Sequence, residues 1–103
     1  MATLVSTHSR HRLNDHFTNP IRLALMATLA GVDEVDFKTL KETVDLTDSA
    51  LSKHAGALEQ AGYVAMRKGF IGKRPRTWLS LTPDGQKALT EHVAALREMT
   101  TGL

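Results

Sequence analysis

Apolar residues recur three or four positions apart over two neighbouring stretches, which is the spacing of one face of a helix. Asn19 followed by Pro20 predicts a helix that begins with an N-cap and a proline, and Gly31 offers it a left-handed end. Asp36 suits the cap of a second helix beginning near Phe37, and the stretch between the helices has room for a short strand at most. The inward positions are Ile21, Leu25, Thr28 and Leu29 in the first helix and Phe37, Leu40 and Val44 in the second.

A third helix is predicted to follow the second after a brief turn at Asp45 and Leu46. Thr47 suits its N-cap, and Gly62 suits its left-handed end. The residues that recur at helical spacing and point inward are Leu51, Ala55 and Leu58. Two helices joined by such a short turn are typical of a helix-turn-helix.

After Gly62 the periodicity changes to two, which predicts two strands. Their apolar members are Val64, Met66, Leu79 and Leu81. Three residues of the connection suit a mobile hairpin tip better than a strand interior, namely Gly69, Gly72 and Pro75. Thr82 and Pro83 then repeat the cap-and-proline signal for a long last helix. One stripe of this helix carries Leu89, Val93 and Leu96. The predicted fold class is mainly α with a small β-hairpin, the winged helix-turn-helix arrangement.

Charge is segregated along the chain, although the formal net charge is only +2. Between Tyr63 and Leu81 there is no Asp or Glu, whereas residues 33–48 carry six acidic residues against two lysines. The basic residues of the hairpin are Arg67, Lys68, Lys73, Arg74 and Arg76. A nearly neutral protein with this segregation, coupled to a helix-turn-helix, is expected to present a basic face to the phosphates of nucleic acid.

The third helix is expected to lie in the major groove of double-stranded DNA, because its inward positions leave a polar face outside. Thr47 at the helix start can cap the helix, contact a phosphate, or do both. Arg74 and Arg76 flank Pro75 at the expected tip and suit a narrow minor groove. The predicted DNA-binding residues are Thr47, Asp48, Ser49, Ser52, Lys53, Arg67, Lys68, Lys73, Arg74 and Arg76.

Two features of the third helix run against a simple DNA-binding interpretation. Asp48 and Glu59 leave this helix with a net charge of −1, so affinity depends on the wing and on other backbone contacts. Gly56 is costly inside a helix, by about 1 kcal/mol relative to alanine. It permits either the close approach of another backbone or DNA, or tight packing against a neighbouring helix.

Several segments in order resemble small stand-alone winged-helix regulators of the MarR and ArsR types. They are Thr18–Leu23, Val35–Leu40, Leu46–Asp48, Leu51–His54, Leu58–Val64, Gly69–Thr77 and Leu81–Gly85. The resemblance spans about Leu13 to Met99. It implies dimeric, operator-binding proteins that usually act as repressors. Where these families commonly carry leucine and a polar residue after the histidine of the recognition helix, this chain has Ala55 and Gly56.

The expected organisation is a single winged-helix DNA-binding domain over residues 1–103. It comprises an N-terminal segment (1–17), the helix-turn-helix with its wing (18–81) and a C-terminal helix for dimerisation (82–103). The residues expected at the homodimer interface are Leu13, Phe17, Leu89, Val93 and Leu96. Two-fold symmetry would place the recognition helices about 34–36 Å apart. A cleft between the terminal helices is open to a small-molecule effector, but no polar cluster identifies one.

The histidines and the tryptophan could have roles other than those above. A metal site from His8, His11 and His16, or from Glu91 and His92 at an interface, is not expected. The His54 ring is expected to be half-buried and bonded to a backbone carbonyl rather than to a phosphate. Trp78 is expected to pack against another element or a partner rather than to stack on a base.

The remaining function classes are narrowed by what the sequence lacks. It has no cysteine, which excludes disulfides and thiolate chemistry, and no apolar run long enough for a membrane span. No catalytic motif is present, so an enzyme and a cofactor are not expected, and the expected location is the cytoplasm. The alternative function is a winged-helix module for protein–protein interaction without DNA binding, which would have no need of the five basic residues of the hairpin.

Overall fold

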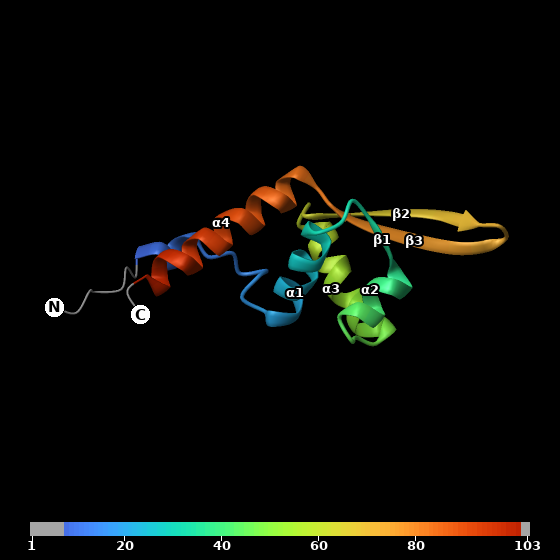
Figure 1. The fold of residues 1–103 in the computed structure, drawn as a ribbon, viewed down its shortest axis with the longest axis horizontal. Coiled ribbons are helices and arrows are strands. Elements are labelled where there is room, and N and C mark those ends of the chain that lie inside the picture. Colours follow the sequence, from blue (N-terminus) through green and yellow to red (C-terminus); the bar gives the residue numbers. More distant parts are fainter. Residues whose placement is uncertain (1–7, 102–103) are drawn as a thin grey trace.

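The computed structural model describes residues 8–101 and has the predicted order of helix, helix, helix, hairpin and helix (Figure 1). The elements are the 3-10 helix η1 (His8–Arg12), α1 (Pro20–Ala30), β1 (Val35–Asp36), α2 (Phe37–Thr43), α3 (Asp48–Gln60), β2 (Val64–Ile71), β3 (Arg74–Leu81) and α4 (Pro83–Thr100). The predicted fold class is confirmed. No helix among residues 8–101 is both long and apolar enough to cross a membrane.

The four α-helices begin at the predicted caps, each of which accepts backbone N–H groups of the first turn through its side chain. The caps are Asn19, Asp36, Thr47 and Thr82. Gly62 ends α3 with the predicted left-handed conformation (φ 83°). The left-handed end predicted for α1 is wrong, because Gly31 stays right-handed (φ −88°) and donates its N–H to Thr28. The turn between α2 and α3 instead places Asp45 in the left-handed region (φ 54°).

The three strands form an antiparallel sheet in the order β1-β3-β2. The register between β2 and β3 runs from Val64 opposite Leu81 to Ile71 opposite Arg74, so the tip consists of Gly72 and Lys73 alone. The prediction that Gly69 and Pro75 belong to the tip is therefore wrong, since Pro75 lies in β3 opposite Phe70. β1 pairs only with residues 78 and 79, so no strand flanks β3 on that side at the proline.

The core gathers apolar side chains from the four α-helices and from the base of the hairpin. Its fully buried members include Phe17, Leu25, Met26, Leu29, Leu40, Leu51, Leu58 and Leu79. The far half of the hairpin leaves this core, and Figure 1 shows it extending to one side while α4 extends to the other. The molecule is accordingly elongated, measuring 65 × 25 × 20 Å. The wing and the terminal helix are thus free to serve different contacts.

The start of α4 is fixed to the start of the hairpin by a dense backbone junction. Thr82 donates its N–H to the Tyr63 carbonyl (3.1 Å) and its hydroxyl to the Gly62 carbonyl (2.6 Å). Gly85 is buried against Tyr63, and a Cβ there would overlap the Tyr63 oxygen and come within 2.8 Å of its carbonyl carbon. Only a residue without a side chain fits this position.

Candidate nucleic-acid interface

The outward face of α3 is polar and carries little bulk. Leu51, Ala55 and Leu58 are at most 2% exposed, so the opposite face of the helix is turned away from the core. Ser49, Ser52 and Lys53 lie on that outward face and are exposed, as predicted from the spacing. Hydroxyl and ammonium groups on an exposed helix face are suited to base edges and phosphates.

The first turn of α3 has its own partners within the protein. The Thr47 hydroxyl accepts the N–H of Ala50 (3.1 Å), so its capping role is present whether or not it also contacts DNA. Asp48 forms an ion pair with Lys41 of α2 (2.9 Å). This exposed pair contributes little to stability, but it offsets the acidic charge that Asp48 brings to the helix.

Gly56 continues the outward face, one turn beyond Ser52 and Lys53. A Cβ at this position would meet no atom within 4 Å outside its own helix backbone and chain neighbours. Tight packing of Gly56 against a neighbouring helix, one of the two interpretations of the sequence, is therefore wrong for the protomer. Close approach of another molecule stays a prediction.

Two arginines of the wing are directed at acidic groups of the protein itself. Arg67 pairs with Glu34 (2.7 Å), and its guanidinium lies 4.2 Å from the centre of the Trp78 ring. Trp78 thus packs against the neighbouring strand, as predicted. Its ring also covers Gly69, because a Cβ added at that position would lie 3.1 Å from a carbon of the indole ring. Arg76 lowers the pKa of Asp36, although the Thr39 hydroxyl bonded to that carboxylate is the larger cause.

Three other cations of the wing point to solvent. Lys68, Lys73 and Arg74 are exposed, with Lys73 in the turn and Arg74 at the first position of β3. The expectation that Arg74 and Arg76 flank Pro75 at the tip is wrong, because Pro75 and Arg76 lie along β3, opposite Phe70 and Gly69. The basic residues at the end of the hairpin are therefore Lys73, in the turn, and Arg74, the strand residue next to it.

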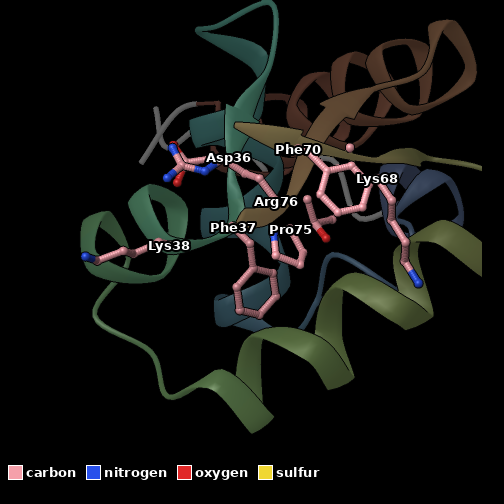
Figure 2. Close-up of a pocket in the computed structure, with 9 residues that line it drawn as sticks. Asp36, Phe37, Lys38, Lys68, Phe70, Pro75 and Arg76 are labelled. Atoms are coloured by element: carbon pink, nitrogen blue, oxygen red, sulfur yellow. The ribbon is translucent and has the colours of Figure 1, made fainter. Parts of the chain in front are cut away.

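A groove between α2 and the wing was not foreseen from the sequence. It has a volume of about 520 Å³, and its lining includes Phe37, Lys38, Lys68, Phe70 and Pro75 (Figure 2). Phe70 is 70% exposed, more than any other large apolar residue of the described chain. The available signal was the apolar pair Phe70 and Ile71 among the basic residues near the end of the hairpin, but the groove depends on how α2 packs beside β3.

His54 sits behind the outward face of α3 and is 7% exposed. Its Nδ1 lies 3.4 Å from Nη1 of Arg22, so the predicted bond to a backbone carbonyl is wrong, and the partner is a side chain. Arg22 is itself held by the carbonyl of His16 (2.6 Å). Burial, followed by the nearby charges of Arg22 and Lys53, lowers the pKa of His54.

His92 of α4 is 2% exposed and contacts the segment between η1 and α1. Its Nδ1 accepts the backbone N–H of Asn14 (2.9 Å), and its ring meets Phe17 edge-on. Burial lowers the pKa of His92. A His92 buried in this way is not available for a metal site at an interface. The described residues contain no group of three or more His, Asp or Glu that could hold a metal, and the His8 side chain lies outside the description.

Because burial lowers the pKa of both His54 and His92, we predict that acid destabilises the fold. Both pKa values lie below the usual 6.5 in the folded chain. The stability that the two neutral histidines contribute is therefore fully present above about pH 6.5, the usual pKa in the unfolded chain. It is lost as the pH falls towards the lowered pKa values of the folded chain, since the unfolded chain takes up protons first. Urea unfolding at pH 7.5 and 5.5 measures this loss. The double variant His54→Gln/His92→Gln should lose less stability between these pH values than the wild type, and an equal loss would refute the assignment.

The predicted dimer residues divide into two groups. Phe17 and Leu89 are 1% and 6% exposed, so the structure assigns them to the core of the protomer rather than to a surface. Leu13, which directly follows η1, and Val93 and Leu96 of α4 are half-buried and stay available at the surface. The segment η1 is held along α4 because Ser9 and Arg12 both bind Glu98, Ser9 at 2.6 Å.

Comparison with known proteins connects these features to a family. Residues 21–100 match the model described as a winged helix DNA-binding domain. An uncharacterized protein of Methanocaldococcus jannaschii is 29% identical over 87 residues, which cover 84% of this chain and 95% of the relative.

Among solved structures, a transcriptional regulator homologue from Pyrococcus horikoshii is similar with a TM-score of 0.77 and 29% identity, covering 85% of this chain and 88% of that one. The MarR family regulator Sco3205 of Streptomyces coelicolor, solved in complex with DNA, shares the fold at 23% identity. Its TM-score is 0.66, and the match covers 91% of this chain and 65% of Sco3205. The predicted resemblance to winged-helix regulators is confirmed by the family model, and the fold is that of a MarR family regulator.

Proposed function

Because the chain belongs to the family of winged helix DNA-binding domains, we propose that it is a sequence-specific, double-stranded DNA-binding transcription regulator. In this proposal it acts in the cytoplasm as a homodimer and represses its targets. The observation that carries the proposal is the outward face of α3, where Ser49, Ser52 and Lys53 are exposed beside a wing with solvent-directed cations. The similarity to a transcriptional regulator homologue supports the same role.

The proposed contacts follow from the surroundings of each side chain. Ser49, Ser52 and Lys53 read base edges in the major groove, and Thr47 adds a phosphate contact at the start of α3. Lys68, Lys73 and Arg74 contact the backbone or the minor groove, since they point to solvent. Arg67, Arg76 and Asp48 have charged or polar neighbours inside the protein, so we give them a supporting role.

Fluorescence anisotropy across a salt series tests this function. Labelled duplexes of random sequence and from upstream of the gene for this chain are titrated with the full chain. We expect salt-sensitive binding to both, with clear preference for a duplex that holds an operator, and a slope that counts the phosphates engaged. If neither duplex is bound even at low salt, the alternative of a protein-interaction module replaces ours.

Dimerisation in this proposal uses the outer side of α4. A hollow of about 330 Å³ lies there, and Val93, Ala94 and Arg97 contribute to its lining. A partly apolar hollow on a terminal helix, at the opposite end from the wing, is a suitable place for a second protomer to pack. It also leaves both recognition helices free.

We predict that Ala94→Glu converts the dimer to monomer. The new carboxylate would be desolvated at the centre of the interface, and this should weaken association by more than about 100-fold. Sedimentation velocity over a concentration series measures the change. Asp84→Asn, an exposed position in the first turn of the same helix and outside the lining of the hollow, serves as the control and should leave association unchanged. A variant that dimerises as well as the wild type would remove this face of α4 from the proposal.

A further inference from the structure

The groove between α2 and the wing combines an apolar floor with lysines on both rims. Figure 2 shows the side chains of Phe37, Pro75 and Phe70 between Lys38 and Lys68, whose side chains extend outward on opposite sides. Phe70 is 70% exposed despite its apolar ring. Such a ring is normally covered in a soluble protein, so this surface is suited to a ligand with an apolar part between negative charges.

The charges around the groove favour an anionic ligand. Lys38, Lys68 and Arg76 lie in the lining together with a single carboxylate, that of Asp36. Asp36 is occupied by capping α2, accepting the N–H (3.2 Å) and hydroxyl (2.6 Å) of Thr39, and Arg76 lies near enough to lower its pKa further. The net charge of the lining is therefore positive, and the two lysines are left to face a ligand.

We propose that this groove holds one sugar–phosphate strand of the DNA duplex, an inference that rests on the proposed function. A duplex with α3 in its major groove and the wing tip in the next minor groove presents one strand between these two contacts. That strand crosses the corner between α2 and the wing, and the groove lies at this corner, lined by Phe37 and Lys38 of α2 and by residues of β2 and β3. The deoxyribose packs on Phe70 and Pro75, while phosphates on either side meet Lys38 and Lys68.

This occupant adds Lys38, Phe37 and Phe70 to the DNA-binding surface. Lys38 belongs to the acidic stretch 33–48, so its role is not visible from the charge pattern of the chain. A sugar–phosphate strand in the groove also gives the exposed Phe70 ring an apolar contact, which contacts between cations and phosphates alone do not provide. Sugar and phosphate contacts of this kind fix the register of the protein on the duplex rather than its sequence preference.

The absence of cysteine from the chain allows a direct test with a single introduced thiol. Phe70→Cys is labelled with an iron–EDTA reagent, which cleaves nearby deoxyriboses when it is bound to a duplex. We expect cleavage confined to a few neighbouring sugars on one strand, between the α3 contact and the wing-tip contact. The control is Asp84→Cys at the start of α4, outside the lining of the α4 hollow and labelled in the same way, which should cleave none of these sugars.

The salt dependence of DNA binding provides a second test of the proposed groove. Lys38→Gln should lower the salt slope by about 0.9, the value for one phosphate, whereas Lys87→Gln on α4 should leave it unchanged. If the wild type binds the duplex but Lys38→Gln keeps its slope and labelled Phe70→Cys cleaves no better than labelled Asp84→Cys, the occupant proposed for the groove is wrong and the DNA-binding function stands. If the wild type binds no duplex, the proposed function itself fails.

Discussion

Gly85→Ala should destabilise the protein by about 3 kcal/mol, the upper part of the range for an added methyl group in a closely packed site. The new Cβ would overlap the Tyr63 carbonyl oxygen and come within 2.8 Å of the carbonyl carbon and 3.0 Å of Cα. These are backbone atoms fixed by the Thr82 hydrogen bond, so no flexible side chain can move aside. For a domain of this size the melting temperature should fall by roughly 15 °C.

Gly56→Ala is the matched control for this substitution. It makes the same change in another helix, but the Cβ meets no atom within 4 Å beyond the local helix backbone. The higher helix propensity of alanine should then raise stability by up to about 1 kcal/mol. Urea unfolding of both variants at one pH compares them directly. A Gly85→Ala protein as stable as the wild type would show that the junction between β2 and α4 is not as described.

The double variant Lys73→Gln/Arg74→Gln should weaken DNA binding by roughly 60-fold at 0.1 M salt. This estimate assigns one phosphate to each cation, so the salt slope should fall by about 1.8. The effect should be similar for random and operator duplexes, because phosphate contacts carry no sequence information. Both residues are exposed at the tip and lie outside the core, so the fold should be preserved.

The control for this prediction removes two charges from the same hairpin. Arg67→Gln/Arg76→Gln deletes the cation paired with Glu34 and the one near Asp36. Its salt slope should stay within about 0.5 of the wild-type value, if these two arginines make no phosphate contact. Equal slopes for the two double variants would mean that the wing acts only through its total charge. A wild-type slope for Lys73→Gln/Arg74→Gln would remove the tip from the interface.

The parts of this fold that the sequence predicted are those fixed by local chemistry. Each cap, from Asn19 to Thr82, needs only a short polar side chain at the start of an apolar repeat. The outward face of α3 follows from the inward spacing of Leu51, Ala55 and Leu58 in the same way. Element order and helix faces were therefore accessible without any tertiary information.

The errors arise where residues distant in sequence meet. Glycine and proline suggested a long mobile tip, but pairing of Phe70 with Pro75 and Gly69 with Arg76 extends the strands to a two-residue turn. The His54 partner is 32 residues away in Arg22, and no periodicity identifies such a pair. Phe17 lies four residues from Leu13 on a plausible stripe, yet it packs on Tyr63 and His92 inside the protomer.

The central claim is that a symmetric dimer reads a DNA sequence through α3, and selection from a random duplex library tests it most directly. The account predicts enrichment of a two-fold symmetric site with half-sites about one helical turn apart, 10–10.5 base pairs. Lys53→Gln should enrich a site altered at particular base pairs. Recovery of sequences without any shared site, from a protein that is folded and dimeric, would contradict sequence-specific recognition by α3.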